Sequence, residues 1–284
     1  MGDNGRATPK GAADKKVKDN SKKEIKILML HGYTQSGTLF RAKTRALEKL
    51  VAKSLAPFKL APVLIYPTAP NRLSPRDIPG FTPAATDDND EHPASTGGTE
   101  PETDAWAWFR KDEAAGQYRL LREGFDAIAD AIRGASGIDG VIGFSQGGAM
   151  AALLAAALEV DAEGKPARQA PAADEDYDWS WVEAVRSANG GRPLRFAVVY
   201  SGFFATPAPL GWLYEPAVGT PTLQYIGSLD TVVEESRSRA LVARCKDPVV
   251  LVHPGGHYVP VNREWVMPLA SFIKQHCEST EAAS

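Results

Sequence analysis

The chain has little cysteine, little net charge and no long apolar run. Cys245 and Cys277 are the only cysteines among 284 residues, and they have neither metal-ligand spacing nor the density of a disulfide scaffold. We therefore expect free thiols in a reducing compartment: the cytoplasm, or also the nucleus because of short lysine clusters. No run of about 18 apolar residues occurs, so no membrane-spanning helix is expected. A net charge of −3 without a basic stripe gives no argument for nucleic acid and favours a small molecule as the partner.

The two ends of the chain and two internal stretches are polar. Residues 1–23 lack the apolar core of a secretory signal and contain acidic residues, unlike a mitochondrial transit peptide, so we expect a disordered tail there and a flexible C-terminus at 279–284. Residues 24–278 are expected to form one domain with insertions at 72–104 and 161–192. Each insertion is either an active-site lid or a surface loop. We favour a loop for the first and leave both options open for the second, where residues 177–182 could form a short amphipathic element.

Short apolar runs alternate with helical patterns through this domain. The runs span residues 25–30, 63–66, 140–144, 196–200, 223–226 and 249–252, and the helical patterns span residues 37–54, 114–133, 146–159, 234–245 and 262–275. Near-continuous apolar runs are typical of strands buried on both faces of a parallel sheet. The alternation predicts an α/β fold, a mostly parallel doubly wound sheet of about six strands with helices on both faces. Such a sheet binds ligands beyond the carboxyl ends of its strands.

One predicted strand ends in a G-x-S-x-G motif, and an alanine-rich helical pattern follows it. This is the arrangement of a nucleophile elbow. Gly143 and Gly147 flank Ser145 where the turned chain has no room for a Cβ atom, and the helix start offers free N–H groups to a developing negative charge. The pentapeptide also occurs by chance in many proteins, so the surrounding motifs have to decide.

A serine hydroxyl needs an imidazole to accept its proton and a carboxylate to orient that imidazole. Behind such an elbow the order is serine, acid, histidine. Asp230 follows one apolar run and is the predicted acid, whereas Asp247 precedes the last strand and would lie at the wrong edge of the sheet. His257 follows the last strand and a Gly-Gly turn and is the predicted general base. His253, on the strand itself, is the alternative and is more typical of a structural histidine.

An oxyanion needs two preorganised N–H donors. The Gln146 amide, directly after the nucleophile, is one predicted donor. The Tyr33 amide is the other, because Tyr33 follows an early apolar run and the dipeptide His31-Gly32. Alone, His31-Gly32 would be taken as a simple turn, but four motifs at the carboxyl ends of predicted strands favour the catalytic interpretation.

Large aromatic residues are candidates for binding the substrate. Trp106 and Trp108 follow the first insertion, and Phe203 follows the run that ends at residue 200. They either wall an acyl pocket above the strand ends or only seal the core, and both options stay open.

These motifs together resemble the FSH family of serine hydrolases within the α/β-hydrolase superfamily. The resemblance covers residues 26–273, and the matching segments are residues 30–33, 35–37, 66–70, 105–109, 143–149, 201–203, 227–230 with 233, and 255–260. It implies an α/β-hydrolase fold and a triad of Ser145, Asp230 and His257. It also implies hydrolysis of carboxylic esters or thioesters, in a group that includes fungal relatives serving polyketide or other secondary pathways. The two insertions depart from the family pattern and bear on substrate size.

We therefore predict a serine carboxylesterase or thioesterase that forms an acyl-enzyme from a small-molecule ester or thioester, without a metal or organic cofactor. The alternatives are a pathway-specific thioesterase or acyltransferase in secondary metabolism, and a non-catalytic α/β-hydrolase scaffold. The sequence leaves open the acyl chain, the leaving group and the oligomeric state.

Overall fold

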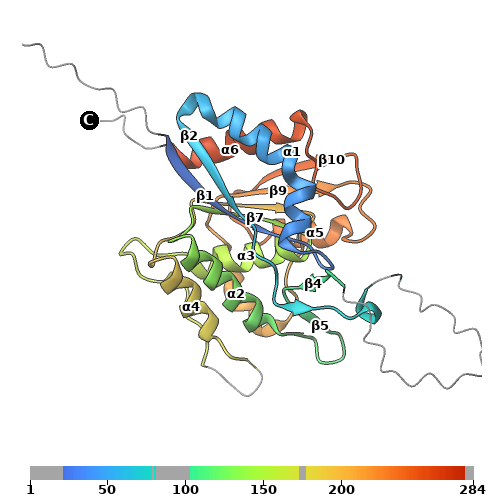
Figure 1. The fold of residues 1–284 in the computed structure, drawn as a ribbon. Coiled ribbons are helices and arrows are strands. Elements are labelled where there is room, and N and C mark those ends of the chain that lie inside the picture. The colour runs from blue at the N-terminus through green and yellow to red at the C-terminus, as the bar shows by residue number, and fades with distance from the viewer. Residues whose placement is uncertain (1–21, 79, 81–102, 173–176, 279–284) are drawn as a thin grey trace, which may run out of the picture.

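A six-stranded parallel sheet forms the centre of the molecule (Figure 1). The computed structural model describes residues 22–78, 80, 103–172 and 177–278. The strand order is β10-β9-β8-β7-β1-β2, and every neighbouring pair is parallel. The strands are β1 (Lys23–Leu30), β2 (Leu60–Ile65), β7 (Gly140–Phe144), β8 (Phe196–Tyr200), β9 (Thr222–Gly227) and β10 (Val249–His253). All six predicted strands are present, and the predicted fold class is confirmed.

Helices cover both faces of this sheet (Figure 1). One face carries α1 (Gly37–Leu55) and α6 (Arg263–Cys277), and the other carries α2 (Leu121–Gly134), α3 (Gln146–Leu158) and α4 (Ser180–Ala188). Alternate residues of β1 belong to different cores, because Ile27 and Met29 pack with α1 and α6 whereas Leu28 and Leu30 pack with α2 and α3. Every residue of β7, β8, β9 and α3 is buried, which explains why these segments read as uninterrupted apolar runs.

The helix predicted over residues 114–133 begins later than expected. Residues 117–119 instead form β6 (Gln117–Arg119), which pairs antiparallel with β5 (Arg110–Asp112). Gly116, at φ 63°, turns the chain between them. Tyr118 stacks on Phe109 with ring centroids 4.1 Å apart, so burial of this aromatic pair prevails over local helix propensity.

The remaining elements are short. A small two-stranded antiparallel sheet pairs β3 (Asn71–Arg72) with β4 (Trp106–Ala107), which follows it after more than thirty residues. Helix α5 (Glu235–Val242) is shorter than the 234–245 segment predicted for it, and there are 3-10 turns η1 (Ala56–Phe58), η2 (Pro75–Asp77) and η3 (Ala208–Tyr214). The predicted tail at 1–23, apart from its last two residues, lies outside the described residues, as do most of the first insertion and residues 279–284.

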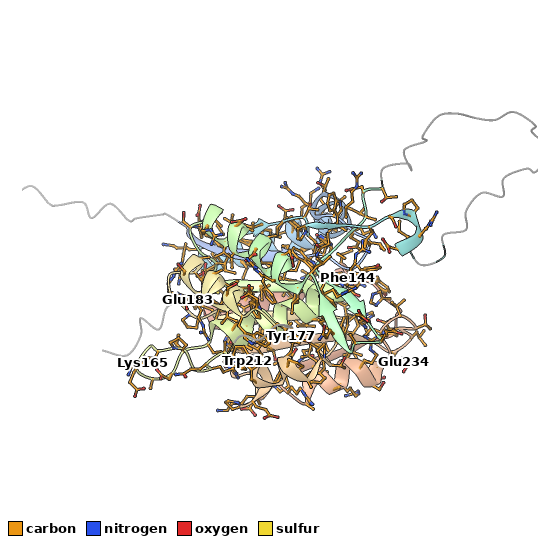
Figure 2. The ribbon with its side chains drawn as sticks, turned by 90° about the horizontal axis from the view of Figure 1, so that it is seen from below. Phe144, Lys165, Tyr177, Glu183, Trp212 and Glu234 are labelled. Atoms are coloured by element: carbon orange, nitrogen blue, oxygen red, sulfur yellow. The ribbon has the colours of Figure 1, made fainter. Side chains whose placement is uncertain are left out.

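The second insertion packs on the α2 side of the molecule. Trp181 of α4 stacks on Phe125 of α2 at 3.8 Å, so the amphipathic element predicted at 177–182 includes the start of a helix that buries one face. Figure 2 places Lys165 and Glu183 of this insertion on the opposite side of the view from Phe144, at the end of β7. The parts of the insertion around Lys165 and Glu183 therefore lie away from the G-x-S-x-G turn.

The topology creates a crevice at the carboxyl ends of β1 and β7. These two strands are neighbours, and from them the chain continues outward in opposite directions, to β2 on one side and to β8 on the other. Ligands of open α/β sheets bind at such a switch point. Over the described residues, no helix combines the length and apolar character that crossing a membrane requires.

Candidate active site

Ser145 occupies a strained turn between β7 and α3. Its backbone has φ 53° and ψ −116°, an unusual conformation for a residue with a side chain. A Cβ atom on Gly147 would lie 2.2 Å from the Leu30 carbonyl oxygen, and one on Gly143 would lie 2.1 Å from the Gly147 carbonyl oxygen. The two flanking glycines are therefore required by close backbone approach, as the motif predicts.

Asp230 and His257 meet beyond the ends of β9 and β10. His257 Nδ1 lies 2.7 Å from Asp230 Oδ2, while Asp230 Oδ1 accepts hydrogen bonds from the Val232 and Val233 amides at 2.9 and 2.8 Å. The Asp230 side chain is 1% exposed and that of His257 is 16% exposed. Burial alone would raise the pKa of Asp230, but the hydrogen bonds from His257 and Val233 outweigh it and lower this pKa below its ordinary value.

The imidazole of His257 also contacts the elbow. Its ring centroid lies 4.7 Å from that of Phe144, the residue before Ser145. Among the hydrogen bonds between described residues, none joins Ser145 Oγ to His257. Catalytic hydrogen bonds in enzymes without substrate are often long and tighten when substrate binds.

The two predicted oxyanion donors flank the serine. Tyr33, Ser145 and Gln146 line one cavity of about 420 Å³. Within the described part of the chain, neither the Tyr33 nor the Gln146 amide donates a hydrogen bond to a protein acceptor, whereas the next amide after Tyr33, that of Thr34, donates to Trp106. Both N–H groups thus remain available to a ligand.

The rival acid and base lie elsewhere. Asp247 is exposed in a turn before β10, at the amino ends of the strands, as the sequence predicts. His253 is 1% exposed and packs between Tyr258 and Trp265, with ring centroids at 5.2 and 5.8 Å. Burial lowers the pKa of His253, against the opposing effect of the Asp230 charge. Neither ring nitrogen of His253 has a partner among the described residues.

His31 supports the loop that carries Tyr33. Its Nε2 accepts a hydrogen bond from the Ala69 amide at 2.9 Å, so the proton of the neutral ring is on Nδ1, which lies 2.8 Å from the Gly32 carbonyl oxygen. Burial lowers the pKa of His31 to about 4, because the charged ring would lose its hydration. His31 is therefore neutral at pH 7 and acts as a structural residue.

The three aromatic residues predicted to bind substrate occupy different places. Phe203 lines the 420 Å³ cavity, whereas Trp106 and Trp108 are not among its lining residues. Trp108 is fully buried and donates through Nε1 to the His31 carbonyl oxygen at 2.9 Å. Its own amide donates to Gln146 Oε1 at 2.7 Å, which ties this loop to the elbow. Trp106 donates through Nε1 to Asp104 at 2.9 Å.

Sequence reasoning missed the charged residues of this cavity. Arg110, Lys111 and Arg237 line it together with Asp77. The first two directly follow the aromatic run that ends at Phe109, and Arg237 lies on α5, the first helix after Asp230. The adjacent basic residues Arg110 and Lys111, directly after the aromatic run, were the feature of the sequence that could have indicated a charged cavity wall.

The parallel sheet, with a strained serine between β7 and α3, defines the class of this protein as an α/β hydrolase. The model of the family described as "Serine hydrolase (FSH1)" matches residues 20–269, and the chain belongs to this family. The predicted family and enzyme class, a hydrolase, are thereby confirmed.

Relatives with similar sequences carry related names. Family of serine hydrolases 2 of Saccharomyces cerevisiae is 29% identical over 256 residues, covering 88% of this chain and 97% of that protein. Esterase OVCA2 of Danio rerio is 28% identical over 261 residues, covering 88% and 97%. An uncharacterized hydrolase of Schizosaccharomyces pombe is 31% identical over 253 residues, covering 87% of this chain and 50% of that protein. The chain spans about half the length of this relative and of a second one from the same yeast.

A solved structure with a similar fold is that of a point variant of Arabidopsis thaliana SOBER1. It superimposes with a TM-score of 0.50 at 18% sequence identity, over 89% of this chain and 100% of that one. This likeness concerns the fold.

Proposed function

We propose that this protein hydrolyses carboxylic esters or thioesters through Ser145, His257 and Asp230, by way of an acyl-enzyme. The observation that carries the proposal is the 2.7 Å contact between His257 Nδ1 and Asp230 Oδ2, at the same edge of the sheet as a serine in a strained elbow. A buried carboxylate bonded to one imidazole nitrogen leaves the other nitrogen to serve as a base.

Proton placement follows from this contact. The Asp230 carboxylate only accepts hydrogen bonds, so Nδ1 of His257 carries the proton and Nε2 has the free lone pair. Because the pKa of Asp230 is lowered, the carboxylate stays charged at neutral pH and stabilises the imidazolium that forms. His257 then takes the proton of Ser145 Oγ as this oxygen attacks the substrate carbonyl carbon.

The reaction proceeds in two steps, acylation of Ser145 and then hydrolysis of the acyl-enzyme. The tetrahedral oxyanion accepts hydrogen bonds from the Tyr33 and Gln146 amides, each of which contributes about 3 kcal/mol to transition-state stabilisation in comparable sites. Collapse breaks the bond to the leaving alcohol or thiol, which receives the proton from His257. Water, activated by His257, then attacks the acyl-Ser145 ester, and the carboxylic acid leaves as the serine regains its proton.

The test compares triad variants with matched controls on p-nitrophenyl hexanoate. Ser145→Ala, His257→Ala and Asp230→Asn should each lower kcat by about 10⁴-fold, because the members of a triad act as a unit. Asp247→Asn and His253→Gln, which change the rival acid and base, should keep wild-type kcat.

Labelling with a fluorophosphonate probe provides a second readout. The wild-type protein should be labelled at Ser145, and Ser145→Ala should not be labelled. Wild-type turnover by a folded Ser145→Ala variant, or loss of turnover in Asp247→Asn alone, would refute the assignment.

A further inference from the structure

The cavity beside Ser145 has an excess of positive charge. Arg110 and Lys111 reach it from β5, Arg237 reaches it from α5, and Asp77 is the one carboxylate among its lining residues. Asp77 is already engaged, because its Oδ2 lies 3.1 Å from Arg110 Nη2. The Arg110–Asp77 pair therefore contributes no net charge.

Among the described residues, the two other cations have no carboxylate within ion-pair distance. Within the described residues, neither Lys111 nor Arg237 forms an ion pair, and Arg237 makes only a 3.5 Å contact with the Val232 carbonyl oxygen. Both lie against the same aromatic ring: Lys111 Nζ is 4.8 Å and Arg237 Cζ is 4.7 Å from the centroid of Phe203. The pKa of Lys111 is lowered, first by partial desolvation and then by the charge of Arg237, against an opposing effect of Glu113. Two like charges therefore lie at one apolar wall of the cavity that Ser145 also lines, and both attract an anion that enters it.

The position of His257 indicates which part of the substrate enters this cavity. His257 lines a different cavity of about 300 Å³, with Phe144, Tyr258 and Val259. The leaving group must receive its proton from His257, so it leaves on that side. The cationic cavity is lined by Ser145 and both oxyanion residues but not by His257, which suits the acyl group.

We propose that the preferred acyl group ends in a carboxylate, so that the substrate is a monoester or monothioester of a dicarboxylic acid whose free carboxylate is bound by Lys111 and Arg237. This rests on the function proposed above. Charge-assisted hydrogen bonds from a lysine and an arginine are stronger than neutral ones, and the Phe203 ring packs against the chain between carboxylate and ester. A cavity of about 420 Å³ suits an acyl chain of a few carbons.

The experiment compares two p-nitrophenyl esters of equal chain length, the monoester of adipic acid and the ester of hexanoic acid, after subtraction of spontaneous hydrolysis. The wild-type enzyme should show a kcat/KM at least about tenfold higher for the adipate monoester, mainly through a lower KM. This ratio should fall as sodium chloride is raised, because salt screens exposed charges.

A third ester, 4-carboxyphenyl hexanoate, places the anion on the leaving group instead. It should have no advantage over phenyl hexanoate. A stronger preference for this ester than for the adipate monoester would overturn the assignment of the cationic cavity to the acyl side.

Variants test the two cations. Lys111→Gln and Arg237→Gln should each reduce the adipate-to-hexanoate ratio by about tenfold. Arg239→Gln is the matched control, since Arg239 lies on the same helix and pairs with Glu235 outside the cavity, and it should keep the wild-type ratio.

The outcomes separate this inference from the function on which it rests. Ser145-dependent hydrolysis of the hexanoate ester with no preference for adipate, or with a preference that survives both glutamine variants and high salt, overturns the carboxylate site and leaves the hydrolase intact. Absence of Ser145-dependent turnover and of fluorophosphonate labelling overturns the function and the carboxylate site together.

Discussion

The two ends of helix α3 handle buried backbone polarity in opposite ways. All 13 residues of α3 are buried, but its amino end borders the cavity that Ser145 and Gln146 line, whereas its carboxyl end is covered by protein side chains. At the amino end, Ser145 is the N-cap without a side-chain capping bond, and the Gln146 amide has no protein acceptor in the described part of the chain. At the carboxyl end, the side chains of Arg168 and Arg186 donate hydrogen bonds to carbonyl oxygens of the last turn. The amino end keeps free N–H donors at the proposed active site, whereas the carbonyl oxygens at the carboxyl end accept hydrogen bonds from arginine side chains.

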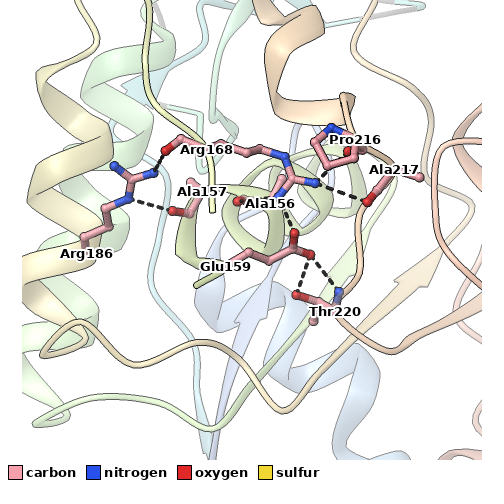
Figure 3. A network of polar contacts seen from close by, with 8 residues as sticks. All are labelled: Ala156, Ala157, Glu159, Arg168, Arg186, Pro216, Ala217 and Thr220. Atoms are coloured by element: carbon pink, nitrogen blue, oxygen red, sulfur yellow. Dashed lines mark hydrogen bonds and ion pairs between the residues drawn. The ribbon is translucent and has the colours of Figure 1, made fainter. Parts of the chain in front are cut away.

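The carboxyl end is held by a network that the second insertion supplies (Figure 3). Arg168 forms an ion pair with Glu159 and donates to the carbonyl oxygens of Ala156, Pro216 and Ala217. Glu159 also accepts from the Thr220 amide at 2.7 Å. Arg168 and Arg186 of the insertion therefore stabilise the carboxyl end of α3. The cavity beside Ser145 is lined by other segments.

The largest expected effect on stability comes from removing the buried ion pair between Arg168 and Glu159. Arg168→Ala leaves the Glu159 carboxylate without its ion-pair partner, and the side chains of these two residues are only 2% and 12% exposed. We expect the free energy of unfolding in urea to fall by about 3–5 kcal/mol. The kcat of the folded protein should not change, because the active-site end of α3 is untouched.

Arg186→Ala is the control for this prediction. Arg186 donates to the carbonyl oxygens of Ala157 and Arg168 at 2.9 and 2.7 Å but forms no ion pair among the described residues, so its loss leaves no buried charge unpaired and should cost about 2 kcal/mol. Equal losses in the two variants would contradict a special role for the buried pair.

An intermediate effect on stability is expected on acidification, because His31 is buried near the amino end of α3. Because the pKa of His31 is lowered from 6.5 to about 4 in the folded protein, the unfolded chain binds more protons between these pH values, and stability falls as the pH decreases through this window. At pH 5 the penalty from His31 should be about 2 kcal/mol relative to pH 7.

The measurement is urea unfolding at both pH values for the wild-type protein and His31→Gln, which keeps an acceptor for the Ala69 amide but cannot be protonated. The variant should lose about 2 kcal/mol less on acidification. An identical pH dependence in the two proteins would mean that His31 does not titrate as its burial requires.

The smallest effect tests the strain at the elbow. Glycine adopts a positive φ without steric cost, so Ser145→Gly should raise the free energy of unfolding by about 1 kcal/mol while removing the proposed nucleophile. Ser145→Ala also lacks the hydroxyl but keeps the Cβ atom and should gain little. If alanine were as stabilising as glycine, the backbone at residue 145 would not be strained.

Patterns in the sequence predicted the framework well because the framework depends on burial. Strands β7, β8 and β9 are buried on both faces, so their apolar runs are unambiguous, and the order of motifs placed Asp230 and His257 after neighbouring strands. Parallel strands bring their carboxyl ends to one edge, which is why chain order alone was enough to predict that Asp230 and His257 lie close together.

The rest depended on contacts that local patterns do not contain. Tyr118 lies in β6 because Phe109 is there to stack on it, and Trp108 is withdrawn from the cavity by its bonds to His31 and Gln146. Lys111 and Arg237 are more than a hundred residues apart in sequence, and only the fold brings both to Phe203. Charged residues such as Lys111 and Arg237 follow no periodic pattern in the sequence that would indicate that they line a cavity.

The position of β10 at the edge of the sheet has a consequence for synthesis of the chain. His257 follows this edge strand and is made about 110 residues after Ser145, which at ribosomal rates is a delay on the order of ten seconds. During that interval the residues of α3 and β8 are synthesised, whereas His257 is still missing. Under the proposed mechanism, ester hydrolysis therefore requires that the last strand of the sheet has been made and that His257 has followed it.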